Sequence, residues 1–209
     1  MRGLCAGLVV GPTTADPSRT LRLPRSLLQL DATTWLVTDL GAWDGTRGAV
    51  WRVRTGAGGV LDVQRVLDGL HLPHAIARGP DGRVYVGEMS RIFRFDPHAE
   101  APGDTVEEVI SGLPDNRLHE HRHPLSKFVF LLDGDLLVNV GAPSDQCTGA
   151  DARNDADLCA QSEGAENAAS LRRYHYDGEG RWSSAHDVFA RGLRNSLALA
   201  VHPSGTVLQ

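Results

Sequence analysis

The sequence predicts an all-β protein built from β-propeller blades, and three observations lead to this prediction. A pattern of apolar strand, tight Asp-Gly-like turn and second apolar strand recurs four times along the 209 residues. The turns fall at residues 31, 81, 133 and 204, so the first two intervals are 50 and 52 residues long. Each of the three complete repeats holds four candidate strands, which is typical of a propeller blade. A β-sandwich, the rival all-β fold, does not explain this period.

The hairpin that opens each repeat is clearest at 72–89 and 125–142, and a third copy occupies 196–209. A weaker copy at 26–41 has Asp31-Ala32 at its turn. Glycine after aspartate tolerates the positive φ that a two-residue hairpin turn needs. The flanking segments are rich in Val, Ile, Tyr and Phe, as strands are.

Two further strands follow each complete hairpin. The third strands are expected at 49–54, 91–96 and 171–177, where apolar and polar residues alternate. The fourth strands are expected at 63–70, 107–113 and 186–193, each ending in Gly-Leu. The predicted blades therefore span 26–70, 72–113, 125–193 with an insertion at 143–170, and an incomplete 196–209, after a poorly defined segment at 1–25. A propeller closes with about four to eight blades, so we expect a piece of a longer protein.

Composition narrows the possible partners. The apolar share of 41% and charged share of 22% are ordinary for a soluble globular protein. A net charge of −5 gives no sign of a nucleic-acid or anionic-membrane partner. No stretch approaches the roughly 20 apolar residues of a membrane span. The first residues mimic a signal peptide with a barely sufficient apolar run, and we interpret them as a truncated or wrongly assigned start.

Cysteine spacing points to an oxidising compartment. Cys147 and Cys159 flank a polar, loop-like stretch, which favours a disulfide that restricts the loop in the unfolded chain. Disulfides persist outside the reducing cytosol. Two free thiols are the alternative, a zinc site is disfavoured because no CxxC pair occurs, and Cys5 is left without a partner.

Two loop segments carry candidate chemistry, and each has several interpretations. Residues 116–127 hold His119, His121 and His123 together with Lys127, the only lysine of the chain. The histidines suit a general base, a metal cluster or a solvated polar loop. Arg194 and Asn195 suit a planar, oxygen-rich anionic ligand, or else a structural arginine bonded to loop carbonyls. Four more residues occupy corresponding positions in the predicted blades: Asp39, Trp43, His74 and Glu88. They either line the central channel of the propeller or complete turns.

Three stretches together resemble the soluble pyrroloquinoline-quinone (PQQ) sugar dehydrogenase family, including its sorbosone-dehydrogenase-like members. They are LHLPHAIARGPDGRVYVGEMSRIFRFD, HPLSKFVFLLDGDLLVNVGAPSDQC and RGLRNSLALAVHPSGTVLQ. The resemblance runs from about residue 65 to the end and more weakly from residue 26. It implies a propeller of the six-bladed type, PQQ and calcium as cofactors, a sugar and an electron acceptor as partners, and a periplasmic or secreted location.

The resemblance also implies roles for individual residues. His123 matches the family's general base, which takes the proton from a sugar hydroxyl. Arg194 would stabilise negative charge on the quinone oxygen, and Asn195 would orient the cofactor. Lys127 stands at a cofactor-binding position where arginine is usual, which keeps the charge and loses the bidentate fork.

The sequence departs from the family pattern in three further ways. Arg122 precedes His123 where glucose-oxidising members have an acidic residue, which argues against glucose and leaves the orienting partner of His123 unknown. Ser196 replaces a proline. The family's calcium-binding turn and further basic PQQ contacts would lie beyond Gln209, so we expect the chain to be inactive alone.

Two other functions remain open from the sequence. A calcium-dependent, lactonase-like propeller hydrolase would gather carboxylates and asparagines around a central metal. A non-catalytic propeller would bind a protein or glycan and would need no base.

Overall fold

The first sheet of the computed structural model follows the order of the sequence. The structure describes residues 8, 10, 20–43, 45–115, 122–123, 125–147, 159–164 and 167–209. The strands β1 (Pro24–Gln29), β2 (Thr34–Asp39), β3 (Gly48–Gly56) and β4 (Gly59–Leu70) form an antiparallel sheet in that order. Consecutive antiparallel strands joined by short turns are the construction of a propeller blade.

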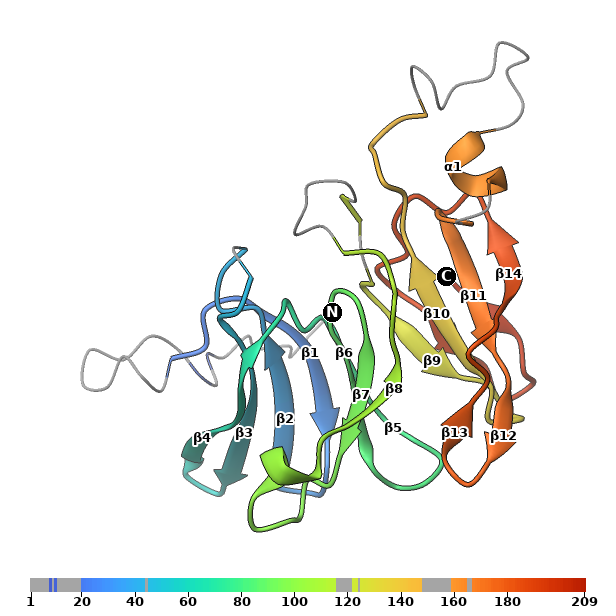
Figure 1. Ribbon diagram of the computed structural model, residues 1–209. Helices are drawn as coiled ribbons and strands as arrows, with labels where there is room; N and C mark the ends of the chain where they lie inside the picture. The colour runs from blue at the N-terminus through green and yellow to red at the C-terminus, as the bar shows by residue number, and fades with distance from the viewer. Residues whose placement is uncertain are drawn as a thin grey trace, which may run out of the picture. The chain divides into compact units, whose positions relative to one another are not determined.

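Two more four-stranded antiparallel sheets repeat this construction (Figure 1). The second contains β5 (Ala75–Arg78), β6 (Val84–Gly87), β7 (Ile92–Phe95) and β8 (Glu107–Ile110). The third contains β9 (Phe128–Phe130), β10 (Leu136–Val140), β11 (Ser170–Tyr174) and β14 (Asp187–Arg191). A two-stranded sheet of β15 (Ala200–Val201) and β16 (Val207–Leu208) follows. The predicted all-β propeller fold with four-stranded blades is confirmed.

The third strand of the third blade is shorter than predicted. The sequence predicts one strand over 171–177, whereas β11 ends at Tyr174 and a separate hairpin follows, made of β12 (Tyr176–Gly178) and β13 (Arg181–Trp182). Side chains capture the backbone at this point. The Tyr176 N–H donates to Asp135 Oδ1 at 2.8 Å and the His175 N–H donates to Ser183 Oγ at 3.1 Å. These bonds replace the ladder that would have continued β11.

Helices are minor elements of the described residues. The 3-10 turn η2 (Pro102–Thr105) joins β7 to β8, and α1 (Ala160–Glu163) follows Cys159. No helix in the described ranges combines the length and the apolar character that crossing a membrane requires.

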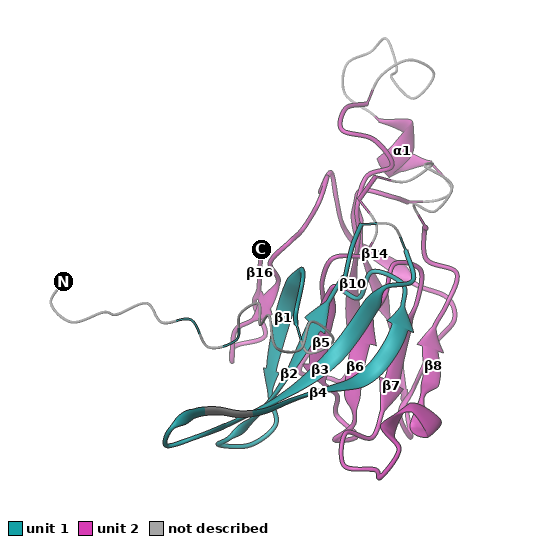
Figure 2. Cartoon of the chain, turned by 90° about the vertical axis from the view of Figure 1, so that its left-hand side faces the viewer, with its two compact units in different colours: residues 1–73 teal, residues 74–209 magenta. Residues whose placement is uncertain are grey.

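The chain divides into two compact units, residues 1–73 and residues 74–209, which Figure 2 shows in teal and magenta. The first unit contains the first blade. Its small core consists of Val37, Ala49, Trp51 and Val53. The second unit contains the second and third blades and the β15–β16 hairpin.

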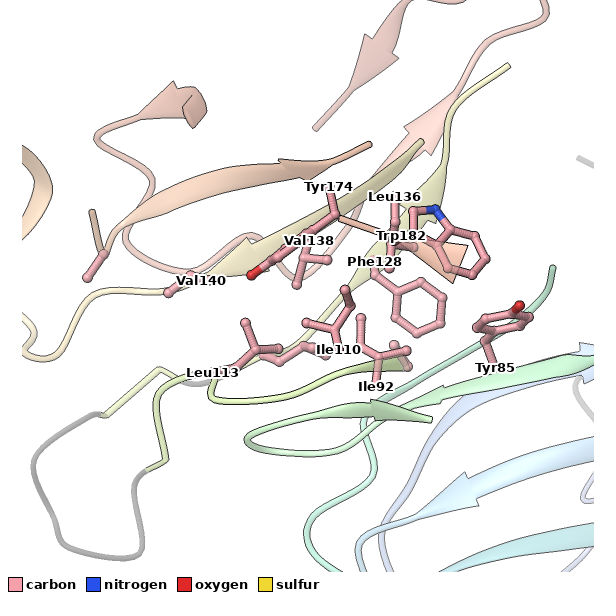
Figure 3. Close-up of a cluster of buried hydrophobic side chains, with 13 residues drawn as sticks. Tyr85, Ile92, Ile110, Leu113, Phe128, Leu136, Val138, Val140, Tyr174 and Trp182 are labelled. Atoms are coloured by element: carbon pink, nitrogen blue, oxygen red, sulfur yellow. The ribbon is translucent and has the colours of Figure 1, made fainter. Parts of the chain in front are cut away.

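The main core of the second unit lies between its two complete blades. Ile92 and Ile110 from one blade face Phe128, Leu136 and Val138 from the other, and all five are at most 4% exposed (Figure 3). Burying each such side chain contributes about 1.5–3 kcal/mol. This core fixes how the second and third blades pack, and with them the segments that connect blades.

Arg94 ties the second blade to the β12–β13 hairpin of the third. Its guanidinium, 10% exposed, pairs with Asp81 at 3.0 Å and with Glu107 at 2.8 Å. The same group donates to the Gly180 carbonyl at 2.6 Å. A charged group this well buried requires such partners.

Candidate functional site

His123 lies against the end of the third blade. The Arg122 N–H donates to the Pro143 carbonyl at 2.9 Å, and the His123 N–H donates to the Ala142 carbonyl at 3.3 Å. These two bonds place the segment before β9 alongside the residues that follow β10. His119 and His121, also named as candidates, lie outside the described residues.

Arg194 is also hydrogen-bonded to the residues that follow β10. Its carbonyl accepts the Ala142 N–H at 2.7 Å, so Ala142 is bonded to both His123 and Arg194. Gly141, the residue before Ala142, allows His123 and Arg194 to approach this closely because it has no side chain. A Cβ at Gly141 would lie 2.2 Å from the His123 carbonyl oxygen and 2.9 Å from that of Arg194. Gly141 and Ala142 therefore hold together the two segments that the sequence singles out.

The carboxylate of Asp145 joins the side chains. The Arg194 guanidinium lies 2.7 Å from Asp145 Oδ1, and His123 Nε2 lies 3.2 Å from the same oxygen. The Arg122 guanidinium pairs with Asp145 Oδ2 at 2.6 Å. Two permanent positive charges thus share one negative charge, and the group as a whole is electropositive. Asp145 is not among the candidate site residues that the sequence pattern indicates.

The His123 ring is oriented by its other nitrogen. Nδ1 lies 2.9 Å from the Ala142 carbonyl oxygen and Nε2 lies 3.2 Å from Asp145 Oδ1, so both ring nitrogens face oxygens that can only accept. The His123 side chain is 12% exposed, whereas those of Arg194 and Asp145 are 58% and 47% exposed. The ring is fixed in place while its partners face solvent.

Asn195 belongs to a neighbouring buried cluster. The Ser126 hydroxyl lies 2.7 Å from Asn139 Oδ1, 3.2 Å from Asn195 Oδ1 and 3.0 Å from the Ser196 carbonyl. Asn139 is fully buried, and its Nδ2 has no hydrogen-bond partner among the described residues. Ser126 thereby ties the residues after Arg194 to the strand that carries Asn139.

Lys127 enters this arrangement through its backbone. Its carbonyl accepts the Asn139 N–H at 3.0 Å, which extends the pairing of β9 with β10. Within the described part of the chain, no residue forms a hydrogen bond or ion pair with the Lys127 ammonium group. The structure thus gives this group no role in the Asp145 cluster.

The insertion carries a disulfide close to Asp145. Cys147 and Cys159 are bonded, with their Cα atoms 5.9 Å apart. Cys147 is two residues beyond Asp145, and α1 begins directly after Cys159. Asp145 therefore lies just before the loop that the disulfide closes.

The four corresponding blade positions have separate surroundings. Asp39 accepts three backbone N–H groups and so completes a turn. Trp43 is 64% exposed beneath the Arg25 guanidinium. Glu88 is buried and pairs with Arg91 at 2.5 Å, while the His74 N–H donates to the Gly87 carbonyl. In the described ranges, no three His, Cys, Asp or Glu residues are placed to hold a metal ion.

Comparison with solved structures supports the fold. The chain is similar to the holo form of the pyranose dehydrogenase PQQ domain from Coprinopsis cinerea, with a TM-score of 0.60 and 18% identity. It is also similar to the iodide and calcium structures of a family AA12 carbohydrate-active enzyme from Trichoderma reesei, with TM-scores of 0.63 and 0.59 and identities of 19% and 18%.

The extent of these matches is uneven. Each covers 90% of this chain but only 43–45% of the solved structure, so the chain spans less than half the length of these neighbours. No protein-family model matches the sequence. No curated protein matches it either. At such identities the shared feature is the fold, an all-β propeller like that of the PQQ domains.

Proposed function

We propose that the chain is part of a PQQ-dependent sugar oxidoreductase in which His123 is the general base. One observation carries this proposal: a single carboxylate oxygen of Asp145 contacts both His123 Nε2 and the Arg194 guanidinium. The two nitrogen atoms therefore lie within about 6 Å of each other. A base and a fixed cation at this separation could act on one bound molecule.

The residues present fit an anionic quinone. PQQ bears carboxylates and quinone oxygens, and exposed guanidinium groups donate well to both. Arg194 and Arg122 would hold such a group, and Asn195 would add an amide donor. When bound, PQQ would supply the acceptor for the hydride that leaves the sugar carbon.

His123 would remove the proton of the sugar hydroxyl at Nε2. In that role Nδ1 would carry the ring proton and donate it to the Ala142 carbonyl, which would leave Nε2 unprotonated as the base needs. In this structure the Asp145 carboxylate stands where the hydroxyl would bind, so the exposed Asp145 side chain must turn aside to admit substrate.

A carboxylate does lie beside His123, although Arg122 stands where an acidic residue precedes the base in glucose-oxidising members. The sequence lacks the acidic residue before His123; the Asp145 carboxylate, 22 residues further along the chain, contacts Nε2, whereas Nδ1 is oriented by the Ala142 carbonyl. The substrate that we propose is an aldose or sorbosone-like sugar. The disulfide supports a periplasmic or secreted location, because such bonds persist in oxidising compartments.

The decisive experiment uses the full-length protein with PQQ and calcium, and follows dye reduction with a panel of aldoses. We expect turnover, and loss of turnover in His123→Ala with PQQ binding largely retained. His98→Gln is the matched control, because His98 is exposed and its hydrogen bond with Asp96 uses only its backbone.

Two results would overturn the proposal. Absence of both a quinone spectral change and dye reduction would remove the dehydrogenase function. Turnover in His123→Ala equal to that of the wild type would remove His123 as the base. Lactone hydrolysis that depends on calcium and not on PQQ would favour the hydrolase instead.

A further inference from the structure

The first blade contains a polar cavity of about 280 Å³ within the first unit. It lies where β2 ends and β3 begins, on the sheet face that carries Trp51 and its cross-strand neighbour Arg65. No residue of the Asp145 cluster lines it. Its polar lining includes Thr20, Arg22, Asp39, Arg47, Trp51 and Arg65.

Two buried polar atoms in this lining lack partners. Trp51 is 2% exposed, yet its indole Nε1 has no hydrogen-bond partner among the described residues. Thr20 Oγ1 is also buried and has no hydrogen-bond partner among the described residues. An indole N–H can only donate, and a buried donor without an acceptor is unfavourable. Two residues that line the cavity, Thr20 and Trp51, therefore each carry a buried polar atom without a hydrogen-bond partner.

The carboxylates around the cavity are already engaged. Asp39 accepts the backbone N–H groups of Arg22, Leu23 and Gly41 at 2.7–3.0 Å. Asp68 accepts the Arg65 guanidinium at 2.7 Å and a backbone N–H at 2.9 Å. Neither carboxylate supplies the acceptor that the indole lacks.

The guanidinium groups outnumber these carboxylates. Arg22, Arg47 and Arg65 line the cavity together with the carboxylates of Asp39 and Asp68. Arg65 is stacked on the Trp51 ring, with its guanidinium carbon 4.7 Å from the ring centroid. The Arg22 guanidinium forms no hydrogen bond or ion pair within the described ranges. The cavity lining therefore includes one guanidinium group held by stacking, that of Arg65, and one without a partner in the described ranges, that of Arg22.

We propose that this cavity binds a small anion through its oxyanion group, either a carboxylate or a phosphate. The indole N–H and the guanidinium groups would donate to its oxygens, since arginine forks match both chemistries. At about 30 Å³ per water molecule the cavity holds about nine waters. It is close to the lower end, about 300 Å³, of ordinary ligand pockets. The ligand is thus no larger than a monosaccharide acid.

The test follows the Trp51 indole N–H signal by NMR, assigned through its loss in Trp51→Phe. Inorganic phosphate and gluconate are titrated separately, with glucose as the neutral analogue and sodium chloride at matched ionic strength. We expect a saturable shift of the Trp51 signal with at least one of the two anions. A response to phosphate alone assigns an inorganic or phosphorylated ligand, and a response to gluconate alone assigns an organic acid.

Arginine variants establish that the response comes from this cavity. Arg22→Gln and Arg65→Gln should each weaken binding about tenfold or more, as expected for loss of a hydrogen bond to a charged group. Arg54→Gln, on the opposite face of the same strand β3, removes the same charge and should leave binding unchanged. The inference is overturned if neither anion shifts the signal, if chloride shifts it equally, or if both cavity variants bind like the wild type.

Discussion

Gly141 offers the sharpest test of how the candidate site is held together, and the substitution is Gly141→Ala. The added Cβ would lie 2.2 Å from the His123 carbonyl oxygen and 2.5 Å from the His123 Cβ. Both neighbours belong to a hydrogen-bonded segment, so the new methyl group can be admitted only if the backbones separate by about 1 Å. The substitution adds no positive-φ strain, because Gly141 is not among the glycines with positive φ.

The magnitude follows from that displacement. Overpacking of this kind costs about 1–3 kcal/mol of stability. Misplacing a catalytic group by about 1 Å costs about a hundredfold in rate. We therefore expect turnover of the full-length enzyme to fall about a hundredfold, because His123 moves away from Ala142 and Asp145. Dye reduction gives the turnover, and urea unfolding followed by circular dichroism gives the stability.

Gly58→Ala is the matched control. No atom lies within 4 Å of a Cβ built at Gly58, and its φ is not positive, so we expect no loss of turnover or stability. Wild-type turnover and stability in Gly141→Ala would refute the close approach of His123 to the end of the third blade. Reduced stability with wild-type turnover would show that the approach is structural and that the chemistry occurs elsewhere.

Three further predictions concern stability. Arg94→Lys should lower the free energy of unfolding by about 1–3 kcal/mol in urea titrations, because one ammonium cannot replace the guanidinium fork. The pKa of His175 is raised by its hydrogen bonds with Asp187 and Asp135. Its stabilising contribution should be complete below about pH 6.5 and disappear as pH rises through the raised value; Asp187→Asn should flatten that dependence in unfolding titrations at pH 5.5–8.5. Reducing the disulfide should cost about 3 kcal/mol, as expected for a loop of this length, and a midpoint unchanged by reductant would contradict this.

Hairpins were predictable because their determinants are local. Gly82 and Gly134 have φ of 82° and 93°, so glycine supplies the expected positive φ, but the connections 79–83 and 131–135 are five residues long and not the two-residue turns predicted. The weaker first copy works differently, because the Asp31 carboxylate accepts the N–H groups of Thr33 and Thr34 at 2.8 and 2.9 Å. These hydrogen bonds from the backbone to the Asp31 side chain stabilise the turn in place of a glycine.

The early end of β11 was not predictable by the same reasoning. The alternation of apolar and polar residues continues through 171–177, so the pattern indicates one strand. What ends β11 is the capture of the Tyr176 N–H by Asp135, a residue 41 positions earlier in the chain. Local periodicity carries no information on such a contact.

Asp145 was missed for a similar reason. In the polar segment after β10, an aspartate has the sequence character of an ordinary solvated residue. Its partners Arg122 and Arg194 lie 23 and 49 residues away. The available signal was the Gly141-Ala142-Pro143 run, which indicates the end of a strand. The structure shows that its glycine is also a point of close backbone approach.

The blade repeat explains why these distant residues meet at all. His123 lies a few residues before β9 and Arg194 a few residues before β15, so each precedes the first strand of a blade. The backbones of both are bonded to Ala142, directly beyond β10. Repetition thus brings the two segments to one end of the third blade, whatever their side chains are. The side chains of His123 and Arg194 are brought together separately, by the Asp145 carboxylate, which belongs to the insertion that interrupts the repeat. In this fold the regular part of the sequence positions the backbone, and the irregular part supplies the charge that gathers the reactive groups.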